Sequence, residues 1–302
     1  MLDSQEFLVY WLVHLVKTQQ ATPSGSTSFT YDNCFGSKSK IFTITMQSIN
    51  IYCREYKLRA MQQTDLSGFN PKSAIDAGLE YIKNLSPDSV KNVSRIIQAL
   101  SLGNADPSQP SAYVGWLIKE KKNDHWETDN VLLDTARAVS ALASYGIIFP
   151  DVTRWLLKQQ LDDGSWNNNL TETAYVLIAL GDVNEKNTSG CRWLAGNPEL
   201  TSTGTIALSI TALCKHGFNE GGFIAESLAV LKQRQLADCS WKSLAISNMV
   251  AQALFAAGEK KTALSVVPWI LSQQHRNGSW KNKSDNTALT LITLKMITEW
   301  KK

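Results

Sequence analysis

Two arginines in the sequence are placed to bind an anion together. Arg95 and Arg137 occupy the same position, the fourth, in two segments that align without gaps, NVSRIIQAL and DTARAVSAL. Neighbouring guanidinium groups hold phosphate or carboxylate through paired hydrogen bonds. Asp134 offers another use for Arg137, because residues three apart on a helix are neighbours and form ion pairs. We therefore expect either a site for an anionic ligand or an internal network of salt bridges.

Asp134 and Glu172 are the candidate acid/base residues beside this pair. Each stands at the first position of its segment, one helical turn before the position that the arginines occupy. A carboxylate there could exchange a proton with a bound ligand. An acid in the first turn of a helix is also favoured by the helix dipole, and Asn286 fills the same place in another segment. The pattern leaves both a chemical and a structural role open.

Segments of this kind recur six times, and their pattern predicts helices. Their starts lie 42, 38, 33, 41 and 40 residues apart, and each has Leu at its ninth position. The second, sixth and ninth positions share one face and are mostly Thr or aliphatic, which is typical of a buried helix face. Several segments run into SLG, ASYG, CKHG or AAG, where glycine favours a helix end. The six segments are 92–100, 134–142, 172–180, 205–213, 246–254 and 286–294.

The fourth and seventh positions of the segments fall opposite the buried face, so we predict that they face a cavity. Only one of these twelve residues is aromatic. The members that we predict to bind a ligand are Arg95, Arg137, Tyr175, Gln98 and Gln252. The remaining members are Ser140, Ile178, Leu208, Thr211, Met249, Leu289 and Ile292.

A second element precedes most of these helices. WLLKQQLDDGSW, VLKQRQLADCSW and WILSQQHRNGSW are near copies, WLIKEKKNDHW is shorter, and CRWLAGNPELTS keeps only the leading tryptophan. The pattern predicts an outer helix that ends at the glutamine and turns through glycine to a buried tryptophan. The stretch that holds Asp162 and Asp163 in the first copy, LDD, reads HRN in another, from His275 through Arg276 to Asn277. We therefore interpret the turn as a structural joint without chemistry of its own.

Each repeat is then a helical hairpin of about 40 residues that must stack on its neighbours to bury its apolar faces. Six or seven such hairpins form either an open superhelix or a closed double ring. A seventh, weaker unit is expected near Phe42 to Cys53. We expect one all-α domain over residues 1–302, with residues 1–73 as a less regular N-terminal repeat or extension.

The repeated segments resemble the terpene cyclase and protein prenyltransferase superfamily, which includes squalene–hopene cyclases. QQLDDGSW and QQHRNGSW are similar to its Gln-x(2–5)-Gly-x-Trp (QW) signature, and LLDTARAVSAL resembles the inner helix that follows it. The resemblance covers most of the chain from about residue 74. It implies an α/α toroid, in which inner helices surround a central cavity and outer helices enclose them.

The sequence departs from the catalytic pattern of that superfamily. Class II cyclases carry Asp-x-Asp-Asp-Thr-Ala at the start of an inner helix, and the middle acid protonates an alkene. The matching residues here are VLLDTA at 131–136, so Leu133 stands at the place of the proton donor. Leucine cannot donate a proton, and one aromatic candidate is few for a cavity that stabilises a carbocation. Cyclisation by the family mechanism is therefore in doubt.

The zinc patterns of the superfamily are incomplete as well. Prenyltransferase β subunits bind zinc through Asp-x-Cys and a distant histidine; DNC at 32–34 has the local form, but no histidine follows before His125. The toroidal zinc enzymes of lanthionine chemistry use cysteines and a Cys-His pair, for which Cys191, Cys214 and His216 are the only candidates. Since neither set is convincing, we predict no metal and no cofactor.

The amino-acid composition limits the remaining classes of function. A net charge of +3 without a block of Lys or Arg argues against nucleic-acid binding. Five irregularly spaced cysteines are typical of reduced thiols, which indicates a cytoplasmic protein. The apolar run Phe7 to Val16 follows acidic residues and is too short to span a bilayer, so we expect neither a signal peptide nor a transmembrane segment.

Two functional hypotheses follow. The first is a non-catalytic toroid that serves as a binding or scaffold module for a protein, a peptide or a small ligand. The alternative is an enzyme or carrier of isoprenoid type, in which Arg95 and Arg137 hold an anionic group and Asp134 or Glu172 acts as acid/base. A cavity in which these side chains converge would favour a small-molecule site, whereas a filled centre with an exposed apolar face would favour a scaffold.

Overall fold

A computed structural model describes residues 26–31, 40–45, 71–102, 111–198, 200–218 and 222–298. Contacts divide the chain into two compact units, Met1–Leu66 and Ser67–Lys302. The single domain that we expected over residues 1–302, with residues 1–73 as its less regular part, stays a prediction. The described part of the second unit is mainly helical, and no helix in the described ranges is long and apolar enough to cross a membrane.

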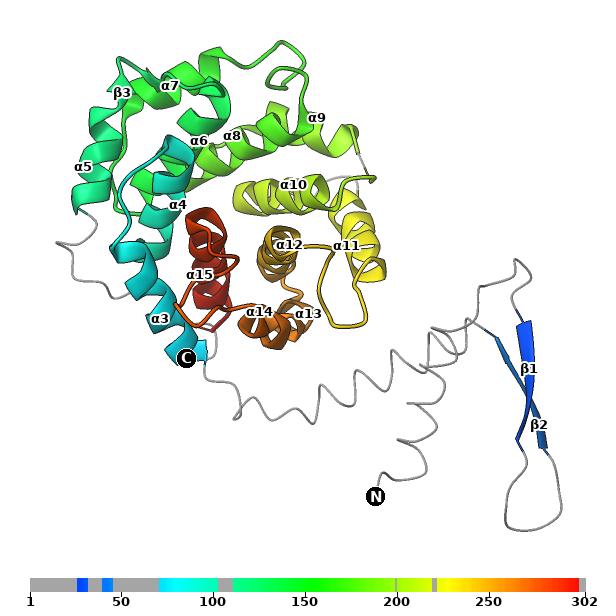
Figure 1. Ribbon diagram of the computed structural model, residues 1–302. Coiled ribbons are helices and arrows are strands. Elements are labelled where there is room, and N and C mark those ends of the chain that lie inside the picture. Colours follow the sequence, from blue (N-terminus) through cyan, green and yellow to red (C-terminus); the bar gives the residue numbers. More distant parts are fainter. Residues whose placement is uncertain are drawn as a thin grey trace. The chain divides into compact units, whose positions relative to one another are not determined.

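Within the described part of the second unit, the inner helices contact one another in a closed cycle. Each inner helix packs against the next along the chain, and α15 packs against α4. Figure 1 shows these helices around a common centre. Every one of the six segments predicted from the sequence lies within one of them. They are α4 (Val90–Ser101), α6 (Val131–Ala143), α8 (Leu170–Asp182), α10 (Thr203–His216), α12 (Leu244–Ala256) and α15 (Ser284–Thr298).

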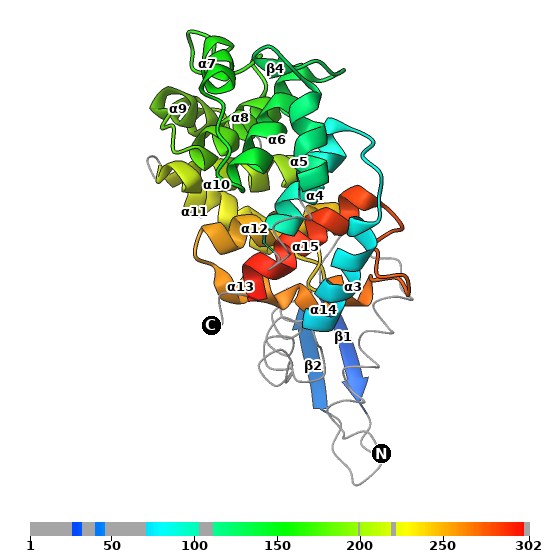
Figure 2. The same cartoon turned by 90° about the vertical axis from the view of Figure 1, so that its left-hand side faces the viewer.

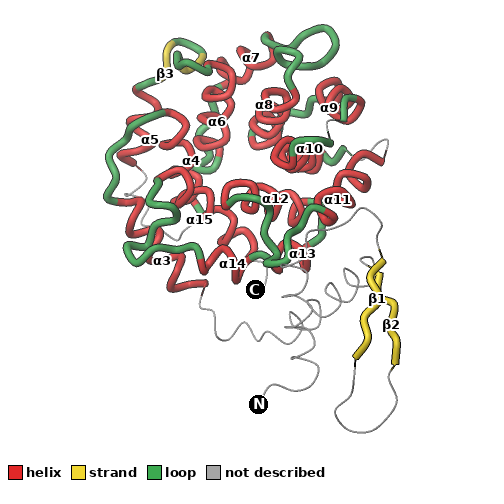
Figure 3. Tube along the Cα trace, turned by 45° about the vertical axis from the view of Figure 1, so that its right-hand side comes forward, coloured by secondary structure: helices red, strands yellow, loops and turns green. Residues whose placement is uncertain are grey.

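The outer helices alternate with the inner ones along the chain. From α4 to α12, each inner helix contacts the outer helix that follows it, and α15 contacts α3, the first outer helix. Figures 2 and 3 show these short helices on the outside of the inner set, joined to it by turns. They are α3 (Pro71–Lys83), α5 (Ser111–Lys119), α7 (Pro150–Lys158), α9 (Thr188–Gly196), α11 (Phe223–Gln233), and the pair α13 (Lys260–Ser265) and α14 (Val267–Ser272).

A fully buried tryptophan joins the outer to the inner helix in four hairpins. In the hairpin of α7 and α8, Trp166 Nε1 donates to Leu156 O at 2.7 Å and its backbone N donates to Thr173 Oγ1 at 3.0 Å. The other three hairpins repeat both bonds, from the indole to the outer helix and from the backbone to a hydroxyl of the inner helix. The four tryptophans, which we call the joint tryptophans, are Trp126, Trp166, Trp241 and Trp280.

The glutamine before the turn attaches it to the next outer helix. Gln160 Nε2 donates to Gly164 O in its own turn at 2.8 Å, and to Asn187 Oδ1 and Ser189 Oγ at the start of α9. Gln235 and Gln274 make the same bond within their turns, and each also reaches the following outer helix. Gln160 thus ties its own turn to the start of α9.

The last turn closes the cycle onto the first outer helix. Gln274 Nε2 donates to Ala74 O of α3 at 2.8 Å. A Cβ placed on Gly78 of α3 would lie 2.8 Å from the Trp280 ring, just as one on Gly190 of α9 would lie 2.9 Å from the Trp166 ring. The contact between the last and first hairpins therefore repeats a contact found between consecutive hairpins.

The shorter fourth copy of the turn forms a two-residue ladder instead of a glycine turn. Strand β3 (Lys121–Lys122) pairs antiparallel with β4 (His125–Trp126). Asn123, between them, has a φ of 47°, a left-handed conformation that asparagine tolerates better than most residues. The φ is also positive at Gly164 and Gly278 in two other copies and at Cys239 in the third. A different turn thus delivers Trp126 to the same joint.

Two strands lie in the first unit, where we expected only a less regular helical part. β1 (Ser26–Tyr31) pairs antiparallel with β2 (Lys40–Thr45), with Phe29 opposite Phe42. The seventh helical unit predicted near Phe42 to Cys53 is therefore wrong for residues 42–45, and residues 46–53 lie outside the described ranges. The physical reason is local, since KIFTIT alternates and is rich in β-branched residues, which favour strands.

Replacing Gly164 with alanine should cost about 3 kcal/mol of unfolding free energy. Gly164 has a φ of 95°, and a Cβ there would lie 2.7 Å from the backbone oxygen of Ser189. Gly146 is the matched control, because its φ is 71° but a Cβ would meet nothing within 4 Å. Gly146→Ala should cost only about 1 kcal/mol. Urea unfolding followed by circular dichroism measures both, and equal losses would contradict the close approach of the turn to α9.

Candidate functional site

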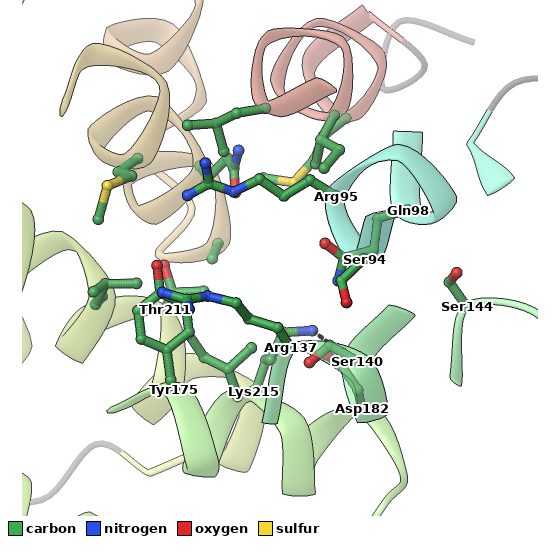
Figure 4. Close-up of a pocket in the computed structure, with 18 of the residues that line it drawn as sticks. Ser94, Arg95, Gln98, Arg137, Ser140, Ser144, Tyr175, Asp182, Thr211 and Lys215 are labelled. Atoms are coloured by element: carbon green, nitrogen blue, oxygen red, sulfur yellow. Dashed lines mark hydrogen bonds and ion pairs between the residues drawn. The ribbon is translucent and has the colours of Figure 1, made fainter. Parts of the chain in front are cut away.

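A cavity of about 480 Å³ lies between the inner helices. All twelve residues predicted at the fourth and seventh positions of the segments line it, including Arg95, Arg137, Tyr175, Gln98 and Gln252. Figure 4 shows several of these side chains extending into the cavity from neighbouring helices. Its volume is within the range of pockets that hold drug-sized ligands. The facing of the helices was therefore predicted correctly, while the binding role of these residues stays a prediction.

The helices extend the lining one turn further than the predicted segments. Residues at the eleventh position, seven after the arginine position, form an additional tier of the cavity because two helical turns return to the same face. The sequence analysis missed this tier because its segments ended at the ninth position. Its members are Leu102, Ser144, Asp182, Lys215, Ala256 and Met296.

Arg137 is held by its own helix and by the next one. Its Nη1 donates to Asp134 Oδ1 at 2.7 Å, and its guanidinium carbon lies 4.7 Å from the centre of the Tyr175 ring. Thr128 Oγ1 donates to the other oxygen of Asp134 at 2.9 Å. The predicted i, i+3 ion pair is thus confirmed. Arg137 Nε is buried and has no hydrogen-bond partner among the described residues.

Arg95 is paired with an acid from a different helix. Its Nη1 lies 3.5 Å from Asp285 Oδ2 in the first turn of α15. Both side chains are largely shielded, with 18% of Arg95 and 28% of Asp285 exposed. The salt-bridge alternative named no partner for Arg95, since only closure of the cycle brings α15 beside α4. Asp285 is the residue just before the sixth segment, so an alignment one position longer would have included it.

The two predicted acid/base residues do not line the cavity. Asp134 faces Arg137 and Thr128, and only 13% of its side chain is exposed. Glu172 accepts a hydrogen bond from Asn167 Nδ2 at 2.6 Å, in the turn before α8. Their acid/base role stays a prediction, and their contacts give them a clear structural role. The arginines and the acids are thus close in sequence but differ in their access to the cavity.

A third ion pair stands at the C-terminal ends of the inner helices. Lys215 of α10 pairs with Asp182 of α8, and both line the cavity. Gln252 Nε2 donates to Thr293 Oγ1 of α15 at 2.8 Å. The polar groups of these helices are therefore partly used to connect neighbouring helices.

The predicted metal candidates have other surroundings. No three of the described His, Cys, Asp and Glu residues come close enough to hold a metal ion. Burial raises the pKa of the Cys191 thiol to about 11 and also raises that of Cys214. His216 Nε2 lies 2.8 Å from Leu177 O, and the backbone N of Asn187 donates to its Nδ1 at 3.4 Å. The triplet at 32–34 lies outside the described residues.

Comparison with known proteins gives a fold and no family. No protein-family model matches the sequence, and no curated protein matches it. Solved structures do match the chain. One such structure is the type II terpene cyclase MstE from Scytonema in its apo form, with a TM-score of 0.59 and 14% identity, over 75% of this chain and 97% of that one. At this identity the likeness shows a terpene-cyclase-like fold alone.

His216 should make the stability of the fold depend on pH below about 7. Burial lowers its pKa below the ordinary value, so the unfolded chain binds a proton that the folded chain does not, and unfolding free energy falls as pH falls below about 6.5. His216→Gln should remove this contribution, which is at most about 1.4 kcal/mol per pH unit. Urea titrations across the range measure it.

The control for this experiment is His275→Gln, because His275 is exposed. This variant should keep the slope of the unmodified protein. An unchanged slope in His216→Gln would show that the imidazole is not buried in its neutral form between α8, α9 and α10.

Proposed function

We propose that the protein binds a small molecule in its central cavity, between the inner helices. The ligand combines hydrogen-bond acceptor oxygens with an apolar body. Its oxygens meet Arg95 and Arg137, and its body lies against the apolar residues of the lining. One observation carries this proposal: Arg137 Nε is buried in the cavity wall without a partner among the described residues. A buried donor of this kind is costly unless a partner satisfies it.

We also propose that the inner and outer helices form an α/α toroid of six hairpins. Three observations support it: the closed cycle of inner-helix contacts, the repeated joint tryptophans, and the terpene-cyclase-like fold. In such a toroid the centre is the natural place for a ligand. The repeated QW-type turns then build the walls and leave the inner helices free to vary.

The cavity supports a small-molecule site better than a docking surface for a protein or peptide. Large apolar residues exposed among the described residues are few, and they lie singly on helix α5 and on turns; they are Ile118, Ile148, Leu161 and Leu236. Single exposed apolar residues are ordinary and mark no interface. Two guanidinium groups in a cavity, in contrast, are the feature that the hypothesis of a small-molecule site required.

We propose binding and no cyclisation for this cavity. A type II cyclase needs a strong acid at the reacting carbon, and Leu133 stands where the resemblance places that acid. The nearby Asp134 is ionically bonded to Arg137 and accepts from Thr128, so its oxygens are already used. A function as a carrier or binding protein requires none of this chemistry. It needs only the cavity and its donors.

Filling the cavity should abolish binding of 1-anilinonaphthalene-8-sulfonate, a probe that joins sulfonate oxygens to apolar rings. Thr211→Trp places a large ring in the cavity lining, and Ile148→Trp adds the same ring at a position that is 49% exposed. The unmodified protein and Ile148→Trp should give blue-shifted emission that saturates at one dye per chain. Thr211→Trp should not, while near-ultraviolet circular dichroism shows that it is folded. Equal emission from both variants, or none from the unmodified protein, contradicts the proposed site.

Arg95→Lys tests how much the guanidinium group of Arg95 contributes to dye binding, in the same titration. Lysine keeps the charge beside Asp285 but lacks the planar set of donors. The dye should bind about ten- to a hundredfold more weakly, which corresponds to the loss of one hydrogen bond to a charged group. Unchanged affinity would show that the sulfonate does not meet Arg95.

A further inference from the structure

The cavity has two chemically different sides. Neighbouring helices α4 and α6 supply a polar wall, which we define as Ser94, Arg95, Gln98, Arg137, Ser140 and Ser144. The consecutive helices α10, α12 and α15 supply an apolar wall, defined as Leu208, Met249, Phe255, Leu289, Ile292 and Met296. Figure 4 shows Ser94, Arg95 and Gln98 extending from one helix of the polar wall, and Arg137 and Ser140 from the other. The polar groups therefore run along the cavity and are not gathered at one end.

The hydrogen bonds of the lining residues show the same division between the polar wall and the apolar wall. Two polar side chains that the helices of the apolar wall present to the cavity have partners within the protein: Thr211 Oγ1 donates to Ala207 O at 2.9 Å, and Gln252 Nε2 donates to Thr293 Oγ1 at 2.8 Å. On the polar wall, Ser94 Oγ and Arg137 Nε are buried without a hydrogen-bond partner among the described residues. Ser94 as a whole is only 1% exposed. The unsatisfied groups thus face the ligand from one side only.

The charges of the cavity are already balanced. Arg95 pairs with Asp285, Arg137 with Asp134, and Lys215 with Asp182, one acid for each base. A ligand with several negative charges would enter a site without spare positive charge, and the three acids would repel it. The free capacity of the polar wall is in hydrogen-bond donors and hydroxyls, which suit uncharged oxygens.

We propose that the ligand is an uncharged, facially amphipathic molecule, with hydroxyl or carbonyl oxygens along one side and hydrocarbon along the other. Its oxygens lie against the polar wall and its hydrocarbon against the apolar wall. This inference rests on the proposed function and narrows the ligand to one class. It differs from a ligand that carries several negative charges at one end of an apolar chain.

Two steroid esters of the same skeleton test this shape. Methyl cholate is uncharged and carries three hydroxyls on one face, whereas methyl lithocholate carries one. The full chain should bind methyl cholate at least tenfold more tightly by isothermal titration calorimetry, as expected for two further hydrogen bonds. Farnesyl diphosphate, a chain with a charged end, should bind more weakly than methyl cholate.

A pair of buried serines provides the matched variants. Ser94 and Ser227 are both buried, and the hydroxyls of both lack a partner among the described residues, but only Ser94 lines the cavity. Removing an unsatisfied buried hydroxyl has little effect on folding, so both alanine variants should unfold at nearly the same temperature as the unmodified protein. Ser94→Ala should weaken methyl cholate binding about fivefold, and Ser227→Ala should leave it unchanged.

Each other result overturns the inference. Equal affinity for the two esters, or an equal effect of Ser94→Ala and Ser227→Ala, would show that the polar wall does not read the hydroxyl face. Tighter binding of farnesyl diphosphate would show that a charged end is recognised. If neither ester binds while the naphthalene sulfonate still binds and Thr211→Trp still abolishes it, the facial arrangement is wrong and the proposed function stands.

Discussion

The fold depends on how each joint tryptophan satisfies its two N–H groups in the interior. A buried donor must be hydrogen-bonded, and each joint tryptophan has one bond to the outer helix and one to the inner helix. The two bonds and the packed ring fix the distance between the outer and the inner helix of the hairpin and their register along the helix axes. Truncation of a buried tryptophan typically lowers the unfolding free energy by about 3–5 kcal/mol. The four joints therefore contribute strongly to the stability of the described part of the second unit.

The same joint explains why the helices close on themselves. A glycine in the next outer helix lets the indole of Trp166 approach α9, and another lets that of Trp280 approach α3. The last hairpin contacts the first in the same way that a hairpin contacts the next one along the chain. The described inner helices therefore form a closed cycle. The inner helices then share one orientation, with all their first turns at one end. Acids such as Asp134 and Asp285 are favoured there by the helix dipoles. Asp134 pairs with Arg137 one turn later on its own helix, and Asp285 pairs with Arg95 of the neighbouring α4.

Much of this arrangement was readable from the sequence, because a repeat compares a chain with itself. The facing of the inner helices followed from positions four and seven, and the i, i+3 pair of Arg137 from helix geometry. One regularity went unnoticed: inner helices that follow a joint tryptophan have Thr or Ser at the second position, whereas Val93 and Ile206 stand there in the two that do not. The pair of Arg95 with Asp285 was not predictable, since it exists only once the cycle closes. Strand β2 was missed because a helical repeat was extended into a segment whose own residues favour a strand.

The cavity shows how a repeated scaffold separates building from recognition. The structural positions are those of the tryptophan, its hydroxyl partner and the glutamine. They recur in several hairpins, and their polar groups are already engaged in hydrogen bonds within the hairpin. The positions that face the centre vary more among the hairpins, so the helices can contribute different surfaces. Two neighbouring helices contribute donors and hydroxyls, and the three consecutive helices from α10 to α15 contribute mostly hydrocarbon. A centre divided in this way distinguishes ligands by the side on which their oxygens lie, which a uniformly apolar cavity cannot do.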